Sequence, residues 1–248
     1  MILSNALTIA ARVVRQIVRD RRTIVIILVV PVVIMTLLNY SFPKVSHALD
    51  GAYPALLATM GLLQSFLITG ISFLRERSQG TMERMMASPA SRLDMVLGYL
   101  LGFFVLALIQ ILVVVLFTIY VLDAYYAQGS VWRICVFQIL VVTVGVNLGI
   151  FISAFARNEF QMVQFIPLII FPQILLCGVI WDVGQMHTAL QWIAKFLPLK
   201  YAVNAMQDIM LQGQSLIDVG YDIGILAAFA VVISFLAAMT LRRVPLNR

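Results

Sequence analysis

The chain has 248 residues, of which 62% are hydrophobic and 11% are charged, and its mean hydropathy is +1.01. Soluble domains are about half apolar and about one quarter charged, so this composition excludes an ordinary soluble protein. The net charge of +6 is divided among short segments between long apolar runs, which argues against a nucleic-acid partner.

The chain begins with an amphipathic segment, residues 2–19. On a helical wheel, its apolar residues fall on one side and its polar and basic residues fall on the other. A helix with these two faces is typical of the boundary between membrane and water. We therefore expect an interfacial helix here, with a simple extension of the first span as the alternative.

Six stretches without a charged residue follow, and each is close to the roughly 20 apolar residues that cross a bilayer as a helix. They predict an all-α, polytopic membrane protein with six transmembrane helices. Because the six spans use most of the chain, we expect residues 1–248 to form a single transmembrane domain. The expected spans are residues 23–42, 52–74, 95–122, 134–156, 161–181 and 223–241.

Basic residues are divided unequally between the two sides of the membrane that these spans define. Thirteen of the 17 Lys and Arg residues fall on the side of the two termini. The other side receives only Lys44, Arg133, Lys195 and Lys200. Because basic residues accumulate in the cytoplasm, we expect both termini to be cytoplasmic, in a plasma membrane or a bacterial inner membrane.

Prolines and short apolar segments predict local departures from straight spans. Pro31 lies in the first expected span, and Pro167 and Pro172 lie in the fifth, where each should kink the helix. Residues 183–217 contain two apolar segments that are separated by Pro198 and are too short to cross. They predict a re-entrant helical hairpin on the outer side, just before the last span.

The cytoplasmic loop of residues 75–92 is the densest cluster of charge in the chain. Thr81 can cap a short helix, and the Ser88-Pro89 pair can end it. Methionines at helical spacing lie between these two points, and methionine surfaces adapt well to protein partners. The residues alone are equally compatible with a docking helix and with an ordinary solvated loop.

Two segments resemble type-2 ABC transporter permeases. Arg75-Glu76-Arg77, Gly80-Thr81-Met82-Glu83-Arg84-Met85 and Ser88-Pro89 are similar to the first cytoplasmic loop of that family. Leu197 to Met206, followed by Gly213, is similar to the segment before its last span. The resemblance implies the permease subunit of an ATP-driven exporter, which works as a dimer, preferably a homodimer, with two separate ATPase subunits and forms the translocation pathway.

The chain itself lacks the residues that an ATPase needs. It has only three lysines, and none follows a glycine, so there is no Walker A loop. We therefore expect no catalytic residue, cofactor or metal site in this chain. ATP and Mg would be bound by the partner ATPase. Spans without charges suit a hydrophobic or amphipathic cargo, such as a drug, a lipid or a lipid-linked molecule. We also expect the spans to contact membrane lipids.

The resemblance also indicates which residues would dock the ATPase and which would line the substrate pathway. The ATPase-docking surface, centred on a cytoplasmic coupling helix, is expected to comprise Glu76, Arg77, Gly80, Thr81, Glu83, Arg84, Met85, Ser88, Pro89, Arg157 and Glu159. Spans one, two and five are expected to border the dimer interface and the substrate pathway. Their candidate lining residues are Met35, Asn39, Met60, Gln64, Phe66, Phe165, Phe171 and Gln173.

Other functions remain open from the residues alone. A secondary transporter or channel would need no ATPase, but proton-coupled transporters usually hold Asp, Glu or His inside the membrane, and the six expected spans contain none. An intramembrane enzyme would need clustered acids, histidines or an activated serine. A scaffold that transports nothing is the last alternative.

Overall fold

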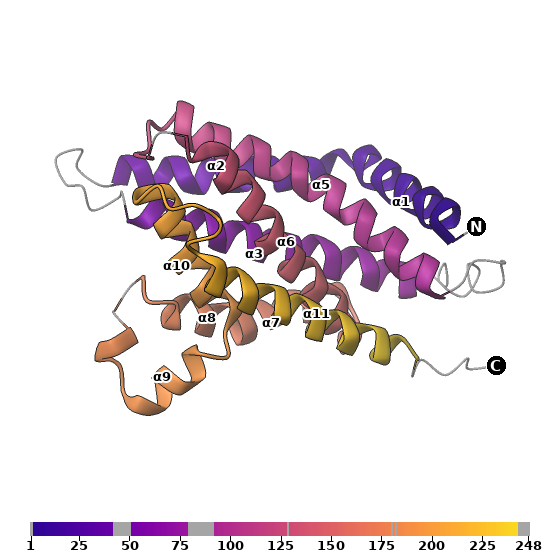
Figure 1. The fold of residues 1–248 in the computed structure, drawn as a ribbon. Helices are drawn as coiled ribbons and strands as arrows, with labels where there is room; N and C mark the ends of the chain where they lie inside the picture. The colour runs from indigo at the N-terminus through magenta and orange to yellow at the C-terminus, as the bar shows by residue number, and fades with distance from the viewer. Residues whose placement is uncertain are drawn as a thin grey trace.

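The computed structural model describes residues 2–41, 51–78, 92–127, 129–179, 181 and 183–242. Throughout these ranges the regular elements are helices, which form an elongated bundle (Figure 1). The first half of the bundle consists of α1 (Ile2–Arg19), α2 (Arg21–Ser41), α3 (Ala52–Ser78), α5 (Arg92–Tyr120) and α6 (Val131–Ser153). The second half consists of α7 (Glu159–Phe165), the π-helical segment η2 (Ile166–Ile170), α8 (Phe171–Leu176), the 3₁₀ turn η3 (Val183–Gln185), α9 (Thr188–Ala194), α10 (Pro198–Leu211) and α11 (Gly220–Arg242).

Among the described residues, five helical segments are long and apolar enough to cross a membrane, and the chain is a polytopic membrane protein by this measure. They are Ala52–Ser78, Leu97–Tyr120, Val131–Ser153, Glu159–Leu176 and Gly220–Ala237. The first expected span, residues 23–42, coincides with α2, whose described apolar stretch, Ile27–Ser41, is shorter than a span. Six spans therefore remain a prediction.

The prolines act differently in the two expected spans. In α2 the helix continues through Pro31. In the fifth expected span, the turn that contains Pro167 widens to the π-helix η2, because proline supplies no backbone N–H to the helical ladder. Pro172 follows η2 directly, at the second residue of α8, and it also supplies no backbone N–H to the helical ladder. The helix ends at Leu176, five residues before the predicted end of that span.

The helices α3 and α6 form the tightest contact of the bundle. A Cβ atom added at Gly145 would lie 2.6 Å from the carbonyl oxygen of Leu62, and one added at Gly149 would lie 2.6 Å from that of Phe66. α6 therefore has glycine at the two positions where the backbone of α3 lies closest to it. Small residues let two helices approach closely and gain van der Waals contact. This contact is important in a membrane, because the hydrophobic effect does not drive helices together there.

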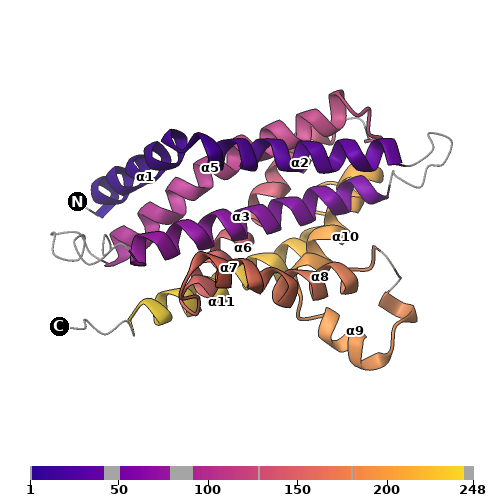
Figure 2. The ribbon, with the colours of Figure 1, turned by 180° about the vertical axis from the view of Figure 1, so that it is seen from behind.

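The amphipathic helix α1 packs in a similar way on the first half of α5 (Figures 1 and 2). A Cβ atom at Gly98 would lie 2.6 Å from the Cβ atom of Ile9, and one at Gly102 would lie 2.9 Å from that of Val13. The apolar face of α1 is therefore covered by protein, whereas Arg15 and Arg19 stay exposed. Whether α1 also lies at the membrane surface stays a prediction.

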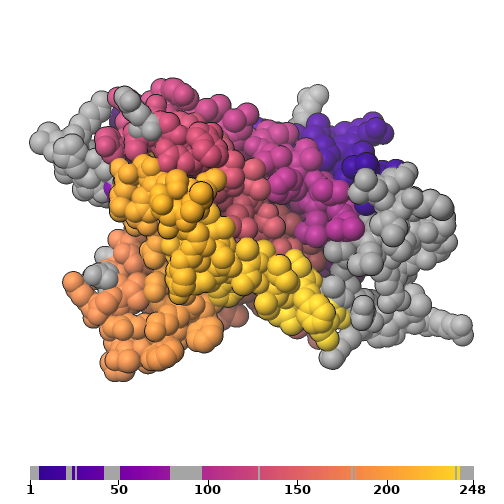
Figure 3. Space-filling model, in the orientation of Figure 1, coloured from indigo at the N-terminus to yellow at the C-terminus, as the bar shows by residue number. Residues whose placement is uncertain are grey.

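The chain between α8 and α11 contains α9 and α10, and we name it the outer connection after the side of the membrane on which it is predicted to lie. Its two helices have different surroundings. α10 packs against α3, α6 and α11, and its Met206, Ile209 and Met210 are completely buried. By contrast, α9 stands away from the bundle (Figures 1 and 3). α10 thus belongs to the core of the protein, which the short length of its apolar segment did not indicate.

We expect Gly149→Ala to destabilise the protein, because the added Cβ would overlap the backbone of α3. Overpacking a close contact costs about 1–3 kcal/mol. Thermal unfolding of the purified protein in detergent should therefore occur at a lower temperature.

Gly224→Ala in α11 is the matched control, since no atom lies within 4 Å of a Cβ added there. Its unfolding temperature should be unchanged or higher, because alanine favours a helix more than glycine does. Equal effects of the two substitutions would show that α3 and α6 are not this close.

Candidate functional site

Three consecutive charged residues, Arg75, Glu76 and Arg77, occupy the last turn of α3. Successive residues of an α-helix point about 100° apart, so the three side chains leave α3 in three directions. Each of them meets a different part of the protein. The following residues, 79–91, contain most of the predicted docking surface and lie outside the described residues.

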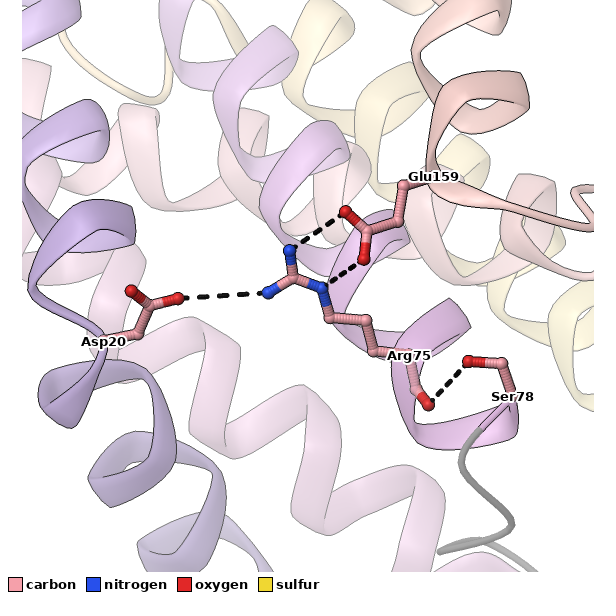
Figure 4. A network of polar contacts seen from close by, with 4 residues as sticks. All are labelled: Asp20, Arg75, Ser78 and Glu159. Carbon is pink, nitrogen blue, oxygen red and sulfur yellow. Dashed lines mark hydrogen bonds and ion pairs between the residues drawn. The ribbon is translucent and has the colours of Figure 1, made fainter.

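Arg75 connects α3 to the start of α7. Its Nε donates a hydrogen bond to Glu159 Oε1 at 2.6 Å, and a terminal nitrogen donates to Glu159 Oε2 at 3.0 Å (Figure 4). The other terminal nitrogen lies 3.9 Å from Asp20 Oδ2, at the junction between α1 and α2. These side chains are 40–50% exposed, so the contacts fix geometry and add at most about 1 kcal/mol of stability.

Glu76 connects α3 to α1. One terminal nitrogen of Arg12 donates hydrogen bonds to both carboxylate oxygens of Glu76, at 3.0 and 2.9 Å. The Glu76 side chain is only 5% exposed, whereas that of Arg12 is 39% exposed. A buried carboxylate is strongly unfavourable without a cation, so the position of α1 depends on this pair.

Arg77 holds the connection between α6 and α7. Its terminal nitrogens donate to the carbonyl oxygens of Ala154 at 3.0 Å and Ala156 at 2.5 Å. The last carbonyl groups of a helix have no partner inside it and carry a partial negative charge. A guanidinium satisfies both needs and fixes the end of α6.

The start of α7 is fixed by its own cap. The Asn158 side chain accepts a hydrogen bond from the backbone N–H of Gln161 at 2.8 Å, and Gln161 Oε1 accepts one from the backbone N–H of Arg157 at 2.8 Å. This reciprocal pattern resembles a capping box. The short connection 154–158 is therefore held at both ends, and Arg157 is exposed.

The structure places the predicted docking residues in two groups. Glu76, Arg77 and Glu159 are engaged with neighbouring helices, as described above, and Arg157 is exposed. Docking by these four residues is not tested by the structure of one chain. The remaining residues of the predicted surface lie outside the described residues: Gly80, Thr81, Glu83, Arg84, Met85, Ser88 and Pro89.

Most of the predicted pathway residues point into the protein. Asn39 and Phe165 are partly exposed, and Phe171 alone among the eight is well exposed, at 57%. The other five are buried: Met35, Met60, Gln64, Phe66 and Gln173. Their spans α2, α3, α7 and α8 nevertheless lie side by side on one face of the bundle (Figure 2).

The polar pathway residues connect helices. Gln64 accepts a hydrogen bond from Gln110 of α5, and Asn39 accepts one from the Tyr53 hydroxyl at 2.7 Å. Gln173 accepts one from the backbone N–H of Leu199, in the first turn of α10, at 3.4 Å. Amide side chains in a bundle satisfy their donors and acceptors in this way, so a role in the pathway would require these contacts to open.

Arg12, Asp20 and Arg75 are site residues that the sequence did not identify. The basic face of residues 2–19 indicated contact with water and headgroups, and nothing in its periodicity places Arg12 beside Glu76. The adjacent Arg-Glu-Arg sequence was the available signal for Arg75. In the described part of the chain, no three His, Cys, Asp or Glu side chains gather as metal ligands, so this site consists of ion pairs and helix-end contacts.

Comparison with known proteins places this site in a family context. Residues 5–211 match the family described as ABC-2 type transporter. The match includes the charged end of α3 and both helices of the outer connection.

Individual relatives agree with this match. ABC transporter G family member 20 of Dictyostelium discoideum is 30% identical over 206 residues, which are 83% of this chain and 27% of that protein. The linearmycin resistance permease protein LnrN of Bacillus subtilis (strain 168) is 29% identical over 65% of this chain and 41% of its own length. The probable multidrug ABC transporter permease YbhS of Escherichia coli (strain K12) is 24% identical over 66% and 43%. The chain thus matches less than half of the length of these relatives.

Arg12→Gln should lower stability more than Glu76→Gln does. The first change leaves a buried carboxylate without its cation, and a buried polar group without a partner costs about 1–3 kcal/mol. The second change leaves Arg12, which water still reaches. Thermal unfolding in detergent would measure both losses.

The double variant Arg12→Gln/Glu76→Gln should be more stable than Arg12→Gln alone, because the unpaired charge is gone. Arg15→Gln, on the exposed face of α1, is the matched control and should unfold like the unmodified protein. Strictly additive losses in the double variant would show that the two side chains do not interact.

Proposed function

The chain belongs to the ABC-2 type transporter family, and from this premise we propose that it is the permease subunit of an ATP-driven exporter. Membership makes it a membrane component of an ABC transporter. Export, the partner subunits and the cargo are the proposal. The observation that carries it is the end of α3, next to the loop that is expected to dock the ATPase. There, Arg75, Glu76 and Arg77 contact α7, α1 and the connection between α6 and α7, respectively.

The proposed complex contains two copies of the chain and two ATPase subunits. Each ATPase binds ATP and Mg and docks on the cytoplasmic loop that follows α3. The face formed by α2, α3, α7 and α8 would meet the second copy (Figure 2). Leu168, Phe171 and Leu175, in η2 and α8, are exposed, and an apolar surface of this kind is compatible with a second protomer as well as with lipid.

The proposed coupling follows from the contacts of α3. Closure of the ATPase pair on ATP would move the cytoplasmic loop and with it the end of α3. Arg75 would transmit this movement to α7, Glu76 to α1, and Arg77 to the connection between α6 and α7. The helices would therefore tilt as a group and open a path outward between the two protomers.

The proposed cargo is hydrophobic or amphipathic. Two of the relatives are named for linearmycin resistance and, with the word "probable", for multidrug transport. The expected spans of this chain carry no charge, which suits an apolar molecule in the pathway. The proposed location is the plasma membrane or a bacterial inner membrane with both termini in the cytoplasm.

The purified chain reconstituted in lipid nanodiscs should hydrolyse no ATP, and addition of its partner ATPase should give hydrolysis that depends on both proteins. Release of phosphate measures the activity. ATP hydrolysis by this chain alone would defeat the proposal. Cargo transport that needs no ATPase would instead establish a secondary transporter or channel.

Glu83→Lys should reduce co-purification of the ATPase, because the change reverses a charge on the expected docking helix, while the unfolding temperature of the permease stays the same. Asp218→Lys is the control, since Asp218 lies exposed in the outer connection, and it should leave the complex intact. If Glu83→Lys changes neither complex formation nor ATP hydrolysis, Glu83 is not part of the docking surface.

A further inference from the structure

The outer connection contains a cavity of about 440 Å³ that the coupling function does not use. It lies where the segment after α8 meets η3, α9 and the start of α10. Its volume is within the range of about 300–1,000 Å³ that is typical of small-molecule sites. The lining residues are Gly178, Val183, Gly184, Gln191, Lys195, Lys200 and Asn204.

Positive charge is concentrated in this cavity. The chain has three lysines, and the two that the structure describes, Lys195 and Lys200, both line it. Within the described residues, neither lysine has a carboxylate within ion-pair distance, and Asp222 acts on Lys200 only at longer range. Asp182 lies outside the described residues.

The walls of the cavity hold further groups that suit an anion. Lys200 lies in the first turn of α10, where the helix dipole favours negative charge. Gln191 Nε2 donates to the carbonyl oxygens of Gly184 at 3.0 Å and Met186 at 2.9 Å, so this wall is held in place. The Asn204 amide adds a neutral donor to the lining.

Exposed aromatic residues lie close to cavity-lining residues in the sequence, and one of them contacts Lys195. Trp181, Trp192 and Phe196 are 64%, 59% and 71% exposed, respectively. The Nζ atom of Lys195 lies 4.2 Å from the centroid of the Trp192 ring, so the cation and the aromatic surface are adjacent. Exposed tryptophans next to lysine are typical of the level of lipid headgroups.

We infer that this cavity binds the phosphate group of an anionic amphiphile, with Lys195 and Lys200 as the cations and the exposed Trp181, Trp192 and Phe196 as the surface for its apolar chain. The anionic headgroup would lie between the two lysines, which have no carboxylate within ion-pair distance among the described residues. The apolar chain would cover the exposed side of α9, which stands away from the bundle (Figure 3). The site would exist whether or not the chain exports this molecule.

Quenching of tryptophan fluorescence by brominated lipids tests the site. The full chain, with Trp132→Phe to remove the one tryptophan elsewhere, is placed in phosphatidylcholine nanodiscs that contain either brominated phosphatidylglycerol or brominated phosphatidylcholine. Phosphatidylglycerol should reach half-maximal quenching at a several-fold lower mole fraction. In Lys195→Gln/Lys200→Gln this preference should disappear.

Two variants separate charge in the cavity from charge in general. Lys195→Arg/Lys200→Arg should keep the preference, and Lys44→Gln, which removes the third lysine, should keep it as well. The ratio between the two lipids is compared within each variant, because the change at Lys195 alters the surroundings of Trp192 directly. A preference that survives in the double glutamine variant, or is absent from the unmodified cavity, overturns the lipid site.

Inorganic phosphate distinguishes the source of the anion. If the anion comes from a lipid, millimolar phosphate should compete with brominated phosphatidylglycerol and weaken its quenching. Protection of Lys195 and Lys200 from acetylation by phosphate, without any lipid preference, would keep the anion site but overturn the lipid as its occupant. Absence of both effects would overturn the site.

Discussion

The pairing of Glu76 with Arg12 imposes the strictest condition on this structure. The carboxylate is almost completely buried, so a cation must reach it, and that cation comes from a helix 64 residues earlier in the chain. Arg12 arrives there only because α1 lies on α5, and α1 approaches α5 closely only because Gly98 and Gly102 have no side chain. The ion pair at the end of α3 and the packing of the first helix therefore depend on each other.

The same end of α3 explains how a force applied at one loop can act on several helices. The glycine contacts with α6 hold α3 along its length inside the bundle. Arg75 and Arg77 hold its end against α7 and the end of α6. A helix held along its length and at its tip moves with its neighbours or not at all. This rigidity is what the proposed coupling requires, because an isolated helix end would absorb the movement of the ATPase.

The sequence predicted an all-helical, polytopic membrane protein and the family. Long uncharged runs carry that information, because the length of a span is fixed by the bilayer. It did not predict that α10 joins the core or which helices Gln64 and Gln173 connect. Apolar character does not distinguish a surface that faces lipid from one that faces protein, and the phase of a helix depends on its neighbours. The partner of Glu76 was missed for the same reason, since it lies on a distant helix.

The most direct test of the account is a covalent connection between α1 and α3. Arg12→Cys/Glu76→Cys, made with Cys135 and Cys177 replaced by alanine, would be joined with a cleavable bifunctional maleimide in the complex with the ATPase. If α1 and α3 move together, the joined protein keeps the ATP hydrolysis and cargo transport that the same variant shows after the linker is cleaved. Loss of transport on joining, with recovery on cleavage, would show that the two helices must separate and would contradict the account.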